Sequence, residues 1–98
     1  MTDQLDIRSG ATEDIEEAYG WYEDHQEGLG DEFLRSVREG LNRIQSHPLS
    51  YATLRRGARH TMLDRFPYGL YYRVEGDTVV VFACYHSSRD PKGWQNRM

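Results

Sequence analysis

The sequence predicts a single α+β domain over residues 1–98, in which a strand and two helices precede a small, mainly antiparallel sheet. Two consecutive segments, 12–28 and 29–47, repeat apolar residues at three- and four-residue spacing, as amphipathic helices do. Residues 59–86 then contain three β-rich runs, and the last of them is apolar on both faces. With 98 residues, 38% of them hydrophobic, the chain can fill one core and not two.

The first strand and the first helix are predicted from residues 5–28. Residues 5–8 alternate apolar and polar, which is typical of a short strand. Thr12 is expected to cap the helix, because its hydroxyl can accept a free backbone N–H and several carboxylates follow that favour the positive helix end. The helix fades in the polar stretch 25–28. Its apolar stripe is Ile15, Ala18, Tyr19 and Tyr22.

The second helix has the clearest pattern in the sequence and ends at Pro48. Its apolar side is Leu29, Phe33, Leu34, Val37, Leu41 and Ile44. A short loop between two amphipathic helices predicts an antiparallel pair whose shared apolar face covers another layer. The sheet that follows supplies that layer.

Three strands are expected at 59–65, 68–75 and 78–86, with a two-residue turn at Gly76-Asp77 joining the last two. They should form a meander. The valine-rich third run is apolar on both faces, so it belongs at the centre of the sheet, with the N-terminal strand beside it. The predicted order is strand, helix, helix and three strands, followed by a short polar tail beyond Pro91.

Charge is divided unevenly along the chain. The net charge of −4 argues against a general nucleic-acid binder and against direct sequence-specific DNA binding by this chain alone. Residues 1–46 contain twelve acidic and four basic residues, whereas residues 47–98 contain eight basic and four acidic ones. The second half can therefore attract an acidic partner that the first half repels.

No segment approaches the roughly 18 apolar residues of a membrane span, and the N-terminus lacks a signal peptide's basic and apolar regions. We therefore expect a cytoplasmic protein without a membrane partner. Cys84 is the only cysteine, so neither an internal disulfide nor a thiolate metal cluster can form, and we expect a buried free thiol. The four histidines share no metal-ligand spacing, and no phosphate-binding or nucleotide-binding motif is present, so no metal or cofactor is expected.

His86 follows the central strand, where a side chain can leave the core. It could act as an acid or base near neutral pH, or it could hydrogen-bond a neighbouring backbone group and fix the tail. Arg89 could pair with an acid or stabilise a phosphate. Tyr71 and Arg73 share one strand face, which could stack on bases or form ordinary cross-strand packing. Trp94 is expected to fold the tail back onto the domain.

This element order, together with residues 67–91, resembles the RelE/ParE superfamily of type II toxin–antitoxin toxins, in its ParE-like branch. The most specific part is the Pro67-Tyr68 pair, the Tyr-Tyr-Arg-Val strand, the Gly-Asp turn and the valine-rich strand leading to His86, Arg89 and Asp90-Pro91. The resemblance covers nearly the whole chain. It implies a growth-inhibiting toxin that is silenced by a cognate antitoxin whose extended segment wraps the helices and the sheet.

The basic half would suit an acidic antitoxin segment or a polyanionic target. We expect the contacts with the antitoxin or the target on a basic sheet face and on the exposed side of the second helix. These candidate contact residues are Arg59, Arg65, Arg73 and Arg89 on the sheet and Arg35 and Arg38 on the helix.

The resemblance leaves the activity divided between two branches. RelE-like members cut mRNA on the ribosome, and ParE-like members are associated with inhibition of DNA gyrase. The ribonuclease branch places an arginine where this chain has Gly69, and Trp94 falls near the position of a catalytic tyrosine. We therefore expect a non-enzymatic toxin that binds a protein target, and DNA gyrase is the first candidate for that target.

Two alternatives remain. One is a ribosome-dependent endoribonuclease that uses His86 as acid or base, with Arg89, Arg65 and Arg73 stabilising the phosphate. The other is a degenerate toxin that only binds its antitoxin and helps to repress its own operon.

Overall fold

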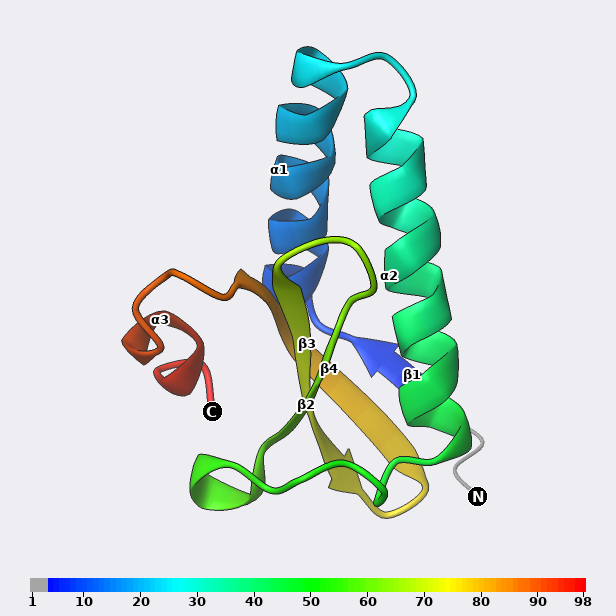
Figure 1. Cartoon of the computed structure of the whole chain (residues 1–98). Coiled ribbons are helices and arrows are strands. Elements are labelled where there is room, and N and C mark those ends of the chain that lie inside the picture. The colour runs from blue at the N-terminus through cyan, green and yellow to red at the C-terminus, as the bar shows by residue number, and fades with distance from the viewer. Residues whose placement is uncertain (1–3) are drawn as a thin grey trace.

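The computed structural model describes residues 4–98 and shows two helices covering one face of a four-stranded sheet (Figure 1). The strand order is β1-β4-β3-β2. The elements are β1 (Gln4–Ile7), α1 (Ser9–His25), α2 (Leu29–Ser46), the short 3-10 turn η1 (Arg55–Gly57), β2 (Arg59–Met62), β3 (Tyr68–Glu75), β4 (Thr78–His86) and α3 (Lys92–Gln95). The α+β class and the element order predicted from the sequence are confirmed.

β4 lies at the centre of the sheet, as its two apolar faces predict. It pairs antiparallel with β3 and parallel with β1, which places Val79 beside both Leu5 and Val74. Every residue from Val79 to Tyr85 is buried. The turn to β4 uses Gly76 at φ +60°, a conformation that glycine adopts without strain.

The helices form the expected antiparallel hairpin, and the connection is held by a carboxylate. Gly28 takes a left-handed φ of 88°. The Glu23 side chain then accepts the N–H groups of Gly28 and Gly30, each at 3.0 Å, and so satisfies free donors at the start of α2. The main core lies between this hairpin and the sheet; its fully buried large side chains are Phe33, Ile44, Leu70, Tyr72, Val79 and Val81.

Two boundaries predicted from the sequence are wrong. The first helix begins at Ser9, so Thr12 lies inside it and does not cap it. The reason is that Arg8 still pairs with the sheet through its N–H and Val81 (2.9 Å), while its carbonyl already accepts the N–H of Thr12 (3.1 Å). The chain thus passes from strand to helix without a loop.

The other boundary is the end of β2, which stops at Met62 and not at residue 65. The N–H of Leu63 bonds the carbonyl of Tyr68 at 2.8 Å, which closes a tight connection to β3. Arg65, inside that connection, has φ 72°, a left-handed conformation that a continuing strand cannot contain.

The C-terminal tail covers the face of the sheet opposite the helical hairpin (Figure 1). Within this tail, residues 92–95 form the short helix α3. Trp94 is buried and stacks on Tyr71, with ring centroids 4.5 Å apart. The prediction that this tryptophan returns the tail to the domain is confirmed. Between residues 4 and 98, no helix is long and apolar enough to cross a membrane.

Candidate functional site

An open groove of about 640 Å³ lies between α1 and the ends of β3 and β4. It exists because β1 pairs with β4 only as far as Val81, so the last residues of β4 have no strand neighbour on that side. Helix α1 passes there instead. The residues that line the groove include Glu16, Glu17, Trp21, Tyr22 and Asp24 from α1, and Tyr68, Cys84, His86, Ser88 and Arg89 from the sheet and its end.

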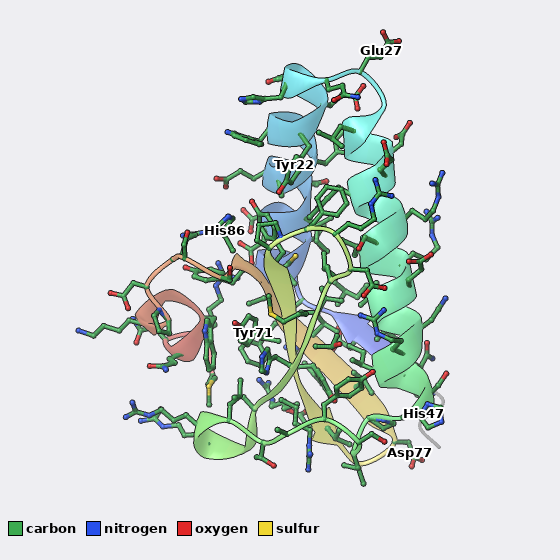
Figure 2. The ribbon with its side chains drawn as sticks, viewed as in Figure 1. Tyr22, Glu27, His47, Tyr71, Asp77 and His86 are labelled. Carbon is green, nitrogen blue, oxygen red and sulfur yellow. The ribbon has the colours of Figure 1, made fainter. Side chains whose placement is uncertain are left out.

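His86 lies at this groove, near Tyr22 of α1 (Figure 2). Its Nδ1 accepts the backbone N–H of Ser88 at 3.0 Å, and Ser88 Oγ lies 2.8 Å from the same atom. A neutral ring that accepts at Nδ1 carries its proton on Nε2. The predicted bond to a neighbouring backbone group is confirmed, and proton transfer by His86 stays a prediction.

Carboxylates dominate the α1 wall of the groove. Glu16, Glu17 and Asp24 are exposed, and none of them forms an ion pair within residues 4–98. Asp14 is occupied, since it accepts the N–H of Cys84 at 3.0 Å and pairs with Arg97. This wall therefore presents negative charge to whatever enters.

The Cys84 thiol and the phenols of Tyr22 and Tyr68, which also line the groove, are neutral at physiological pH. Burial, and then the charge of Asp14, raises the pKa of Cys84 to about 12. Burial also raises the pKa of Tyr22 and Tyr68. The expected buried free thiol is confirmed, and it supplies no thiolate nucleophile.

The arginines expected on one basic sheet face do not lie together, and two of them form ion pairs within the chain. Arg65 pairs with Glu32 of α2 at 2.7 Å. Arg73 pairs with Glu75 and lies over the Phe82 ring. Both guanidinium groups are therefore partly neutralised within the chain.

Arg59 lies away from the other sheet arginines. It donates to the backbone carbonyls of Tyr51 and Leu49, and so holds the loop that follows α2. The alternation of β2 explains its position, because Arg59 shares a strand face with Thr61, which bonds Arg43 of α2. Arg59 thus belongs to the helix side of the sheet.

The cations that form no ion pair within residues 4–98 lie at separate places. Arg35 and Arg38 lie exposed on α2, as expected. Arg89 lies over the Tyr85 ring at 4.1 Å and lines the groove. Arg55 and Arg56, exposed in η1, were missed from the sequence, where only their adjacency could have marked them.

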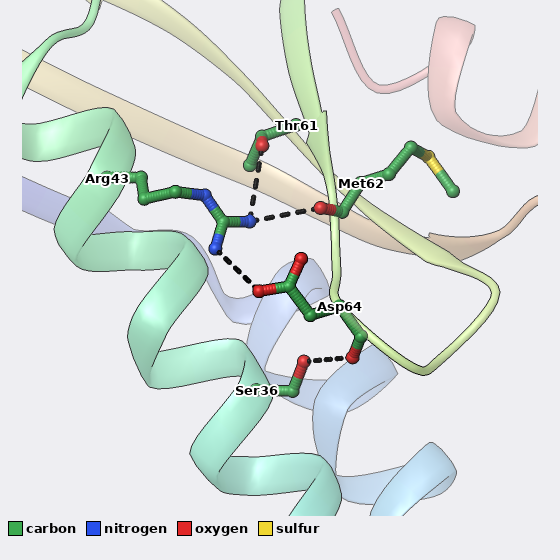
Figure 3. A network of polar contacts seen from close by, with 5 residues as sticks. All are labelled: Ser36, Arg43, Thr61, Met62 and Asp64. Carbon is green, nitrogen blue, oxygen red and sulfur yellow. Dashed lines mark hydrogen bonds and ion pairs between the residues drawn. The ribbon is translucent and has the colours of Figure 1, made fainter.

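A polar network fastens α2 to the connection between β2 and β3 (Figure 3). Arg43 donates to the carbonyl of Met62 at 3.0 Å, contacts Thr61 at 3.4 Å and pairs with Asp64 at 3.5 Å. Ser36 Oγ donates to the carbonyl of Asp64 at 2.7 Å. These bonds assign Arg43 a structural role and hold the connection that carries Arg65.

The resemblance implies an arginine of the ribonuclease branch at the position of Gly69, and the space beside this glycine is tight. A Cβ there would lie 3.1 Å from Met62 Sδ and 3.2 Å from a ring carbon of Tyr71. An arginine would therefore need both neighbours to move. Trp94, near the second expected catalytic position, is buried and has no hydroxyl proton.

A smaller hollow of about 200 Å³ lies on the α3 side of the sheet, lined by His60, Tyr71 and Trp94 among others. His60 stacks on Tyr71, and its Nδ1 is buried without a hydrogen-bond partner within residues 4–98. Burial lowers the pKa of His60. Across the same residues, no three His, Cys, Asp or Glu side chains lie close enough to hold a metal ion.

A helical hairpin on a four-stranded sheet is the arrangement that the resemblance to small toxins of the RelE/ParE class implies. The family model for the ParE toxin of the parDE type II toxin–antitoxin system matches residues 5–91. The chain belongs to the ParE toxin family, and the resemblance seen in the sequence is confirmed. α3 lies beyond the matched residues.

Two curated relatives and one solved structure agree with this family assignment. The chain is 27% identical over 92 residues to Toxin ParE2 of Mycobacterium tuberculosis, in strains CDC 1551 / Oshkosh and ATCC 25618 / H37Rv, covering 93% of this chain and 88% of those proteins. A structure of the chromosomal ParDE TA system from P. aeruginosa shares the fold, with a TM-score of 0.70 and 19% identity, over 85% of this chain and 94% of that one.

Proposed function

We propose that this ParE-family toxin acts by binding a protein target, with DNA gyrase as the first target to test, and that a cognate antitoxin neutralises it. Family membership supports the toxin role. The antitoxin follows from the parDE system named for the family and from the ParDE complex of the structural relative.

The charge of the groove beside His86 is the main support for a toxin that binds a protein and does not cleave RNA. Metal-free RNA cleavage needs cations around the phosphate as well as an acid and a base. Here Glu16, Glu17 and Asp24 line the opposite wall, and Arg89 is the one arginine among the lining residues. Such a groove repels a polyanion, so it favours a protein ligand over RNA.

The remaining uncovered cations supply the contact residues of this proposal. Arg35 and Arg38 on α2 and Arg89 after β4 are accessible to an acidic segment of the antitoxin or of the target. Arg59, Arg65 and Arg73 contribute less, because their guanidinium groups are already engaged inside the chain. An extended antitoxin segment can also add a strand to the outer edge of β2 beyond Arg59, which already forms a bridge with Thr53.

One observation favours the endoribonuclease as a second candidate. His86 and Arg89 line the same groove, so an acid or base and a phosphate-binding cation are available together. The set lacks a further cation at position 69, where neighbouring side chains close the space.

Purified toxin added to a gyrase supercoiling reaction tests the proposal. The expected result is inhibition, restored to the uninhibited rate by equimolar antitoxin. Arg35→Glu with Arg38→Glu should weaken antitoxin or gyrase binding, whereas Asp77→Asn, at the far hairpin turn, should not. Unimpaired supercoiling alongside mRNA cleavage would favour the nuclease, and harmless expression with intact antitoxin binding would favour the degenerate toxin.

A further inference from the structure

The α1 wall of the groove carries an exposed tryptophan in a fixed position. The Trp21 residue is 56% exposed, although large aromatic side chains are usually buried. His25 stacks on it at 3.8 Å and bonds the Trp21 carbonyl through Nδ1 at 2.6 Å. Tyr22 meets it edge-on at 5.1 Å. The indole is therefore ordered before any ligand arrives, which reduces the entropic cost of binding.

Two carboxylates flank this indole on the same helix face. Glu17, Trp21 and Asp24 are spaced by four and three residues within α1, which places them in one row. All three line the groove, and neither carboxylate forms an ion pair within residues 4–98. An aromatic face between two carboxylates is suited to a guanidinium or ammonium group, through cation–π attraction and ion pairing together.

We propose that the groove receives a segment of the cognate antitoxin in which an arginine or lysine side chain lies between apolar residues. The cation contacts Trp21 between Glu17 and Asp24, and its apolar neighbours pack against Tyr22 and Tyr68. This inference rests on the proposed neutralisation by an antitoxin.

Charge complementarity is the reason for choosing this occupant. The uncovered arginines lie on α2, in η1 and after β4, whereas the α1 wall is negative. An antitoxin that wraps the toxin therefore meets surfaces of both signs, and an acidic segment cannot cross the α1 wall without repulsion.

The test measures the affinity of the full toxin for the antitoxin encoded beside it, by calorimetry at low salt. We expect Glu17→Gln with Asp24→Asn to raise Kd at least tenfold, and Trp21→Ala to do the same. The matched control is Glu27→Gln with Asp77→Asn, which removes two exposed carboxylates at opposite ends of the molecule (Figure 2). Its Kd should change less than twofold.

Unchanged affinity in both groove variants, or an equal loss in the control, would overturn the inference. A reversed pair gives a second readout: Glu17→Lys should lose affinity and regain it when the antitoxin's basic residue is changed to Glu. If the unaltered toxin does not bind the antitoxin at all, the proposed function itself fails. Binding that survives in the unaltered toxin but ignores the groove variants overturns the groove assignment alone.

Discussion

The Asp14 carboxylate in α1 forms two hydrogen bonds with the Arg97 guanidinium, at 2.6 and 3.0 Å, and so joins the first helix to the C-terminus. Asp14 also accepts the N–H of Cys84, and Arg97 donates to the carbonyl of Phe82 at 3.2 Å. The two side chains thus provide hydrogen-bond partners for backbone groups in the part of β4 that does not pair with β1. This pairing raises the pKa of Arg97.

Arg97→Met should lower the free energy of unfolding by about 2 kcal/mol, because it leaves a largely buried carboxylate without its charged partner. The Asp14 side chain is only 9% exposed. Urea unfolding measures the change, and a cycle with Asp14→Asn gives the coupling between the two. Arg8→Met, which breaks the exposed pair with Asp6, is the control and should cost under about 0.5 kcal/mol. Equal losses in both variants would contradict a special role for this pair.

Two helix glycines should respond in opposite directions to alanine. A Cβ at Gly40 would lie 2.8 Å from Cδ1 of Leu70, a fully buried side chain, so overpacking of about 1–3 kcal/mol should exceed the gain in helix propensity. A Cβ at Gly20 meets nothing within 4 Å, so Gly20→Ala should stabilise by about 0.5–1 kcal/mol. Thermal unfolding compares the two. A Gly40→Ala protein as stable as the wild type would refute the close approach of α2 to the sheet.

Cys84 should be unreactive in the folded protein. Its pKa is raised to about 12, so the thiol stays protonated at pH 8. An aromatic disulfide reagent should therefore modify it only as fast as the protein unfolds, and rapidly in 6 M guanidinium chloride. Rapid modification without denaturant would show that the groove opens to the thiol.

Stability should fall as the pH drops below about 6.5, the pKa expected for histidine in the unfolded chain. Burial lowers the pKa of His60 in the fold, so the unfolded chain binds the proton first, and the loss continues until the pH passes the lowered value. His60→Phe keeps a ring against Tyr71 and should reduce the difference in unfolding free energy between pH 7.5 and 5.5. Asn42→Ala, at an exposed site without a titratable group, should leave that difference unchanged.

The strands and helices with strong periodicity could be predicted from the sequence. β3, β4 and their turn were located correctly, because a run apolar on both faces and a Gly-Asp pair are local signals. The start of α1 could not be predicted, because it depends on the hydrogen bond between Arg8 and Val81, which are far apart in the chain. Thr12 had every local feature of a cap, and tertiary structure overrode them.

The candidate site was only partly visible in the sequence. His86 and Arg89 were recognised, because they follow a central strand. The expected basic face is dispersed in the structure, because counting charges by chain half does not show which arginines pair within the fold, as Arg65 does with Glu32. The acidic wall could not be predicted, because the sequence does not show that α1 runs beside the free edge of β4. Only that placement brings Glu17 and Trp21, which are four residues apart on the helix, to the same groove.

The most direct test of a binding toxin is primer extension on a reporter mRNA in a reconstituted translation reaction that contains the purified protein. We predict full-length mRNA at every toxin concentration that inhibits the gyrase reaction. Specific cleavage within ribosome-bound codons, lost in His86→Ala while that variant keeps the wild-type unfolding temperature, would contradict the account.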